Sequence, residues 1–102
     1  MAWLAVARLA DLPEGHPVRA EAGDFLLVLV RQGDVVRAGD GLCPHKFGDL
    51  AQGTLLPNGR LRCPLHEASF DLVTGASDQA FAPPLRMYAT RVVEGMVEVE
   101  VH

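Results

Sequence analysis

Two short segments that each contain a cysteine and a histidine constrain this chain more than any other feature. Residues 43–45 read Cys-Pro-His, residues 63–66 read Cys-Pro-Leu-His, and seventeen residues separate the two segments. The chain contains no other cysteine. Thiolate and imidazole are the soft and borderline ligands that hold zinc, copper and iron–sulfur centres. The sequence therefore predicts one metal centre. Its four predicted ligands are Cys43, His45, Cys63 and His66.

The spacing leaves more than one kind of centre open. Zinc sites usually combine a C-x2–4-C pair with an H-x3–5-H pair, whereas each segment here holds one cysteine and one histidine. That mixture is uncommon for zinc, but a structural zinc site remains an alternative. Proline follows each cysteine, and its fixed φ suits a rigid loop beside a metal.

Size and charge exclude several classes of protein. A chain of 102 residues is expected to form one domain and has no room for a second, catalytic one. Its net charge of −4 argues against nucleic acid as a partner. No apolar run approaches the length of a membrane span, and the first residues lack the features of a signal peptide. If both cysteines bind metal, no disulfide remains, which favours a reducing cytosol.

Short apolar stretches between glycine-containing turns predict an all-β fold. The stretch 25–30 is continuously apolar and predicts a strand buried on both faces, and a helical turn capped by Asp11 is expected near 11–15. The other expected strands are 3–9, 18–21, 34–38, 70–73, 85–93 and 96–101. The expected turns are Gln32-Gly33, Asn58-Gly59, 74–76 and Glu94-Gly95. This pattern favours an antiparallel sandwich or a partly open barrel.

A hairpin at 54–62 explains how residues twenty apart could share one metal centre. Asn58-Gly59 between apolar arms is a strong signal for a hairpin. We expect this hairpin to place the two cysteine–histidine loops side by side.

The motifs and their flanks resemble the Rieske family, and the soluble Rieske ferredoxins in particular. The flanking residues that carry the likeness are Leu50, Gly53, Ala68-Ser69-Phe70-Asp71 and Thr74-Gly75. The resemblance implies a 2Fe–2S cluster in which two cysteines hold one iron and two histidines hold the other. It implies an antiparallel β-sandwich or barrel with an inserted cluster-binding subdomain. On this likeness the base is 1–40 and 74–102, the subdomain is 41–73, and Pro83 and Pro84 belong to a third loop over the cluster.

The resemblance also implies a function. Soluble Rieske ferredoxins carry single electrons from a flavoprotein reductase to a terminal oxygenase, often an aromatic-ring dioxygenase, and bind both transiently. The chain shows no phosphate loop, no flavin or nicotinamide motif and no separate nucleophile, so we expect a cytoplasmic electron-transfer protein that binds no membrane and is not itself an enzyme. Two alternatives are the small Rieske subunit of a nitrite-reductase-like enzyme and a zinc-stabilised interaction module.

Departures from other family members predict a low reduction potential. Respiratory members carry a serine and a tyrosine whose hydroxyl groups donate to the cluster, and here those positions are Ala68 and Phe70. They also carry a disulfide between the ligand loops, at positions occupied here by Gly48 and Leu65. Glu67 stands where the family usually has glycine, and we expect its negative charge to lower the potential further.

Overall fold

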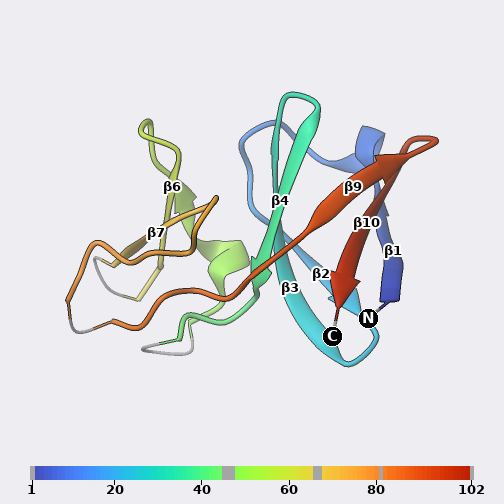
Figure 1. The fold of residues 1–102 in the computed structure, drawn as a ribbon. Helices are drawn as coiled ribbons and strands as arrows, with labels where there is room; N and C mark the ends of the chain where they lie inside the picture. The colour runs from blue at the N-terminus through green and yellow to red at the C-terminus, as the bar shows by residue number, and fades with distance from the viewer. Residues whose placement is uncertain (1, 45–47, 66–67, 81, 102) are drawn as a thin grey trace.

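Three antiparallel sheets form this protein (Figure 1). The computed structural model describes residues 2–44, 48–65, 68–80 and 82–101. One sheet has the strand order β1-β10-β9, a second has β2-β3-β4-β8, and a third has β5-β6-β7. The strands are β1 Ala2–Arg8, β2 Val18–Ala22, β3 Phe25–Gln32, β4 Val35–Asp40, β5 Thr54–Leu55, β6 Arg60–Arg62, β7 Ser69–Asp71, β8 Met87–Tyr88, β9 Thr90–Val93 and β10 Met96–Val101. The predicted all-β fold is confirmed.

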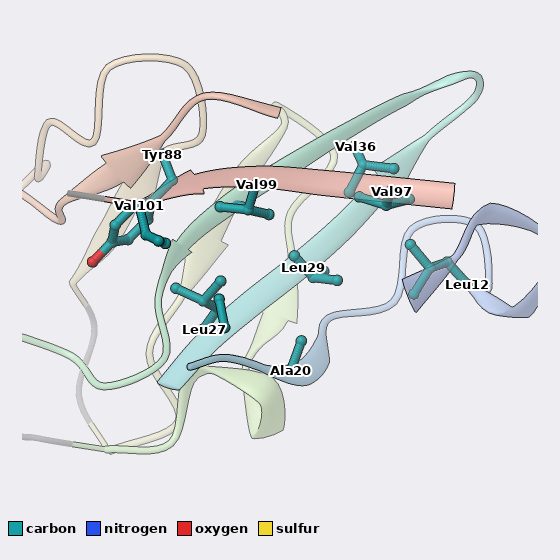
Figure 2. Packing of buried hydrophobic residues seen from close by; sticks show 11 residues of the cluster. Leu12, Ala20, Leu27, Leu29, Val36, Tyr88, Val97, Val99 and Val101 are labelled. Carbon is teal, nitrogen blue, oxygen red and sulfur yellow. The ribbon is translucent and has the colours of Figure 1, made fainter. Parts of the chain in front are cut away.

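Strand β3 contributes to two hydrophobic cores. Successive side chains of a strand point to opposite faces, and Leu27 and Leu29 enter a core with the alternating valines of β10 (Figure 2). Val28 and Val30 enter a second core, which contains both cysteines. All four side chains are at most 1% exposed, which confirms the prediction of a strand buried on both faces. Strand β3 therefore packs against the sheet β1-β10-β9 on one face and against the sheet β5-β6-β7 on the other.

Each tight hairpin turn contains a glycine with positive φ. Glu94 and Gly95 both have positive φ, at 50° and 79°, as a type I′ turn requires, so the last predicted hairpin is confirmed. The turn between β3 and β4 lies one residue later than predicted. Gln32 pairs with Val35, which leaves Gly33 and Asp34 as the two turn residues. Gly33, with a φ of 65°, takes the left-handed conformation at the first turn position.

Other predicted elements also differ from the structure. The strand expected over 70–73 is β7, Ser69–Asp71, and residues 72–74 form a turn. The single strand expected over 85–93 is divided, because β8 pairs with β4 in one sheet whereas β9 pairs with β10 in another. The expected helical turn is a 3-10 helix, η1, at Leu9–Asp11, and Asp11 is its last residue and does not cap it. The division of 85–93 is decided by distant pairing partners, whereas η1 is closed by a local hydrogen bond from the N–H of Leu12 to the carbonyl of Leu9.

The third sheet contains the predicted hairpin at 54–62. Thr54 pairs with Arg62 and Leu55 with Leu61, around a turn that includes Gly59 at a φ of 85°. A short 3-10 helix, η2, Leu50–Gln52, precedes this sheet. Across the described residues, no helix has the length and apolar character that crossing a membrane would require.

Candidate metal centre

The two predicted ligand loops are closed in the same way. Leu42 pairs with Asp49 across the base of the first loop, and the backbone N–H of Cys43 donates to the carbonyl of Gly48 at 2.9 Å. In the second loop Arg62 pairs with Ser69, and the N–H of Cys63 donates to the carbonyl of Ala68 at 3.0 Å. Each cysteine therefore opens a six-residue loop at the end of an antiparallel pair, which gives the two loops a common frame.

Both cysteines point inward. Cys43 is fully buried and Cys63 is 2% exposed, and both belong to the second hydrophobic core. Other members of this core are Leu50, Leu61, Phe70 and Leu85. In contrast, Leu65 in the second loop is 64% exposed and Leu42 at the start of the first is 41% exposed. The loops thus hold their sulfurs away from water and direct apolar side chains outward.

The two loops touch each other at a glycine. A Cβ built on Gly48 would lie 3.2 Å from Sγ of Cys63 and 2.9 Å from Cγ of Leu65. The first loop therefore approaches the cysteine of the second to van der Waals distance, with little room for a side chain between them. The prediction that the hairpin at 54–62 brings the loops side by side is confirmed.

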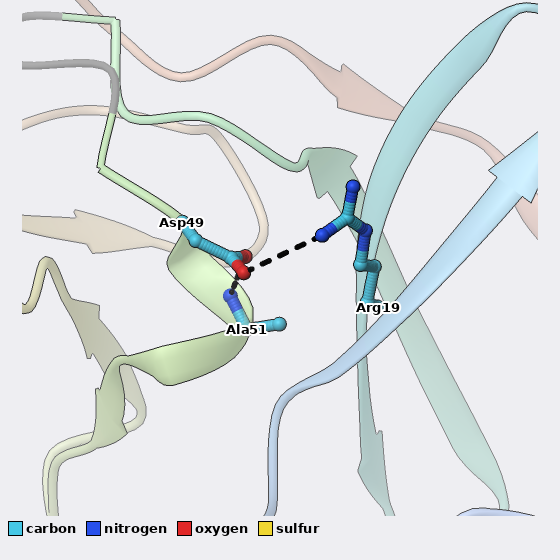
Figure 3. A network of polar contacts seen from close by, with 3 residues as sticks. All are labelled: Arg19, Asp49 and Ala51. Carbon is cyan, nitrogen blue, oxygen red and sulfur yellow. Dashed lines mark hydrogen bonds and ion pairs between the residues drawn. The ribbon is translucent and has the colours of Figure 1, made fainter.

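The first loop is connected to the base by Asp49. Its carboxylate accepts a hydrogen bond from the N–H of Ala51 at 3.0 Å and so caps η2, and it lies 3.9 Å from the guanidinium of Arg19 on β2 (Figure 3). The Arg19 side chain is 60% exposed, so the capping bond contributes more to stability than the ion pair.

A polar network that the sequence analysis missed holds the strand after the second loop. Arg60 on β6 donates from Nε to the hydroxyl of Ser69 at 2.9 Å, and from Nη2 to the carbonyls of Ser69 and Ala76 at 3.0 and 2.7 Å. The N–H of Ser69 donates to the carboxylate of Asp78 at 2.8 Å. The sequence carries no signal for this network, because the residues that bond one another are 9 to 16 positions apart and meet only in the folded sheet.

The network lowers the pKa of a carboxyl group. The backbone N–H of Ser69, its hydroxyl and the positive charge of Arg60 all favour the charged form of Asp78, and its pKa lies below the ordinary value. The pKa of Asp71 is lowered mainly by hydrogen bonds from the N–H groups of Val73 and Thr74. Both carboxyl groups are therefore charged at neutral pH.

The segment with the two adjacent prolines is held by its neighbours. Ala82 and Leu85 are buried in the same core as the cysteines, and the N–H of Leu85 donates to the carbonyl of Gly75 at 2.7 Å. Gly75 has a φ of 83°, and a Cβ there would collide with the carbonyl of Leu85. Pro83 and Pro84 are exposed between these anchors. That they cover a cluster stays a prediction.

Several predicted residues lie outside the described part of the chain. These are His45, His66, Glu67 and His102. Among the described residues no group of three or more metal-binding side chains gathers, so the four-ligand set stays a prediction. His16 is exposed.

The residues present fit a cluster held between two loops. Two cysteine side chains from different loops lie in one apolar core, and the absence of a side chain at Gly48 allows the first loop to approach Sγ of Cys63 closely. A histidine follows each cysteine in the same six-residue loop. This donor set supplies two thiolates and two imidazoles, which is the combination a Rieske centre uses.

Comparison with known proteins decides the family. Residues 2–89 match the Rieske [2Fe-2S] domain. The chain belongs to the Rieske [2Fe-2S] domain family. The cofactor of this Rieske domain is a Rieske-type 2Fe–2S cluster, which replaces the zinc alternative.

The relatives of this Rieske domain include ferredoxins over nearly their full length. The anthranilate 1,2-dioxygenase ferredoxin subunit of Burkholderia cepacia is 34% identical over 100 residues, which cover 97% of this chain and 92% of the relative. The ferredoxin of carbazole 1,9a-dioxygenase from Nocardioides aromaticivorans IC177 superposes with a TM-score of 0.92 at 30% identity, with both chains fully covered. A chain from a complex of reduced oxygenase and oxidised ferredoxin in carbazole 1,9a-dioxygenase has a TM-score of 0.83 at 30% identity, covering 95% of this chain and 100% of the other.

Proposed function

We propose that this Rieske protein is a ferredoxin that carries single electrons, with Cys43 and Cys63 bound to one iron and His45 and His66 to the other. The observation that carries the proposal is the meeting of two matching loops at Gly48 with both cysteines buried. Its similarity to ferredoxin subunits along almost the whole chain supports the same role.

The bound cluster would accept and release one electron at a time. Two thiolates and two neutral imidazoles balance the formal charge of an oxidised core, which eases reduction relative to four thiolates. The chain's own part is to exclude water from the two sulfurs through the second core. It also presents exposed apolar side chains beside the ligand loops, at Leu42 and Leu65, where another protein can approach.

We further propose a flavoprotein reductase as electron donor and a terminal oxygenase as acceptor, both bound transiently. The named relatives support the oxygenase as a partner, because one is a dioxygenase ferredoxin subunit and another comes from a complex of an oxygenase with a ferredoxin. In this proposal the chain catalyses no reaction itself and acts in the cytoplasm. Residues 41–73 act as the cluster-binding subdomain, on a base formed by 1–40 and 74–102.

The ligand assignment is tested with single variants. Cys43→Ser, Cys63→Ser, His45→Ala and His66→Ala should each abolish or severely reduce cluster assembly, whereas His16→Ala and His102→Ala should leave it unchanged. Iron and acid-labile sulfide contents of the purified variants, with visible spectra, provide the measurement. Full cluster content in any of the four ligand variants overturns the assignment, and a colourless wild-type protein with bound zinc overturns the function.

The carrier role needs a second experiment. Protein reduced chemically without oxygen and then mixed with a dioxygenase component should be reoxidised, with one electron delivered per cluster. Stopped-flow spectra at the cluster absorbance follow the transfer. If the chain copurifies as a fixed subunit and delivers no electron after separation, the independent carrier is excluded.

A further inference from the structure

We infer that Arg60, acting with Ser69 and Asp78, is a positioning residue that fixes the second ligand loop and, through its charge, raises the reduction potential of the cluster. This inference rests on the proposed function, because it requires a cluster beside that loop. No residue of this network is a predicted ligand.

Arg60 holds three backbone segments together. Its own strand β6 enters the second ligand loop, and Ser69 on β7 is the first residue after that loop. The guanidinium bonds both the hydroxyl and the carbonyl of Ser69, and then reaches the carbonyl of Ala76 in the next segment. A planar guanidinium can bind several acceptors in a fixed geometry that a lysine ammonium cannot reproduce. The two ends of the ligand loop are therefore set relative to each other by one side chain.

The neighbouring segment is attached to the same point. The backbone N–H of Asp78 donates to the carbonyl of Ser69 at 3.0 Å, and the carboxylate of Asp78 accepts the N–H of Ser69 at 2.8 Å. Phe70 and Ser77 form a bridge between the two segments. This segment continues to the predicted third loop, so the network connects the base of the second ligand loop to the chain that leads to Pro83 and Pro84.

The network also determines what the Ser69 hydroxyl does. Ser69 is 2% exposed, and its hydroxyl oxygen accepts a hydrogen bond from Nε of Arg60 at 2.9 Å. Its backbone N–H donates to the carboxylate of Asp78 at 2.8 Å. Ser69 is therefore bonded through both its side chain and its backbone to the Arg60–Asp78 network.

The two charges act in opposite directions on a nearby redox centre. A positive charge favours addition of an electron and a negative charge disfavours it, and the interaction is stronger where water is partly excluded. Arg60 is half-buried and balances the carboxylates of Asp71 and Asp78, whose pKa values it lowers. Removing Arg60 leaves those negative charges uncompensated beside the second loop, whereas removing the charge of Asp78 has the opposite effect.

Shifts of the midpoint potential in opposite directions in Arg60→Gln and Asp78→Asn would distinguish an electrostatic role of Arg60 from a purely structural one. Arg60→Gln should lower the midpoint potential and accelerate loss of the cluster, about tenfold or more, because hydrogen bonds from a charged group are lost. Arg60→Lys keeps the positive charge but cannot make the three hydrogen bonds of the planar guanidinium. This variant should therefore lose the cluster faster than wild type, while its midpoint potential stays close to that of wild type. Asp78→Asn should raise the potential, because it removes a negative charge beside the second loop. Its amide oxygen can still accept the N–H of Ser69, so the local structure should be kept.

The control removes an equal charge far from the loops. Arg91→Gln breaks the 2.6 Å contact with Glu98 in the base sheet, on strand β9, which lies far from β6 and β7 (Figure 1). Protein-film voltammetry gives the potentials, and the decay of the visible spectrum under a chelator gives the rate of cluster loss. Shifts of equal sign in Arg60→Gln and Asp78→Asn, or shifts no larger than that of Arg91→Gln, overturn the inference.

Failure of this inference can be distinguished from failure of the proposed function. Wild-type protein is assayed first for iron and sulfide, and absence of the cluster there defeats the function itself. If Arg60→Gln fails to fold, Asp78→Asn decides the matter, because its side chain is exposed and the protein should fold. An unchanged potential in Asp78→Asn then counts against the inference.

Discussion

Gly48 and Leu65 face each other across the gap between the two ligand loops, so that a Cβ on Gly48 would lie 2.9 Å from Cγ of Leu65. In a disulfide, the Cβ of one cysteine lies about 3 Å from the sulfur of the other, as follows from an S–S bond of about 2.05 Å. These are the two positions at which the respiratory members of the family carry a disulfide. The separation of Gly48 and Leu65 is therefore compatible with a disulfide between these two positions.

This geometry predicts that Gly48→Cys with Leu65→Cys forms a disulfide between the loops. The chain-entropy model assigns about 3 kcal/mol to a crosslink that closes roughly fifteen residues, so the unfolding free energy should rise by up to that amount. Mass spectrometry after alkylation under denaturing conditions should find two modified thiols, those of Cys43 and Cys63. Each single cysteine variant serves as a control with three. Four modified thiols in the double variant after oxidation would contradict the predicted geometry.

The missing hydroxyl groups near the second loop lead to a prediction about potential. Ala68 and Phe70 are both fully buried beside the loop, and hydrogen bonds to cluster sulfurs favour the reduced state. Ala68→Ser with Phe70→Tyr should therefore raise the midpoint potential by tens of millivolts up to about 100 mV, using roughly 59 mV per tenfold for one electron. Ala10→Ser, at an exposed position in η1, is the control and should cause no shift. A folded, cluster-containing double variant with an unchanged potential would refute the hydrogen-bond account.

The single tyrosine predicts how stability depends on alkaline pH. The hydroxyl of Tyr88 donates to the carboxylate of Asp40 at 2.6 Å, and burial together with this bond raises the pKa of Tyr88 to about 12. The folded state thus retains the proton more tightly than the unfolded state, whose tyrosine has a pKa of about 10. Stability should be complete below about pH 10 and decline as the pH rises from there toward 12.

Titration of tyrosinate absorbance tests this directly, because the chain contains no other tyrosine. Tyr88→Phe should remove the decline between pH 10 and 12 and, at neutral pH, cost about 1 kcal/mol for the lost hydrogen bond. An ordinary midpoint near pH 10 in the folded protein would show that the contact with Asp40 does not protect the hydroxyl.

The cap and the ion pair of Asp49 predict unequal effects. Asp49→Ala removes the acceptor for the N–H of Ala51 at the start of η2, directly after the first ligand loop. It should lower the unfolding free energy by about 0.5–2 kcal/mol. Arg19→Ala removes only the exposed partner at 3.9 Å and should cost no more than about 0.5 kcal/mol. Urea unfolding of the two variants measures both, and an equal loss would mean that the ion pair, and not the cap, stabilises this segment.

The sequence by itself determined the chemistry of the site and the class of the fold. Cys43 and Cys63, each followed by a histidine, are local signals, because these residue types predict a zinc or iron–sulfur centre wherever the loops lie. The alternation of Val97, Val99 and Val101 and the pair Glu94-Gly95 are equally local, since period and turn conformation depend on adjacent residues. These predictions are confirmed for the fold, whereas the ligand set stays a prediction.

Tertiary structure decided the features that depend on distant partners. The break between β8 and β9 exists because the two strands pair with different sheets, which residues 85–93 alone do not reveal. The contact of Gly48 with Cys63 and the network of Arg60 with Ser69 join segments that lie up to sixteen residues apart. Side-chain packing and hydrogen bonds across strands follow from register and sheet order, and neither is encoded in a short window of sequence.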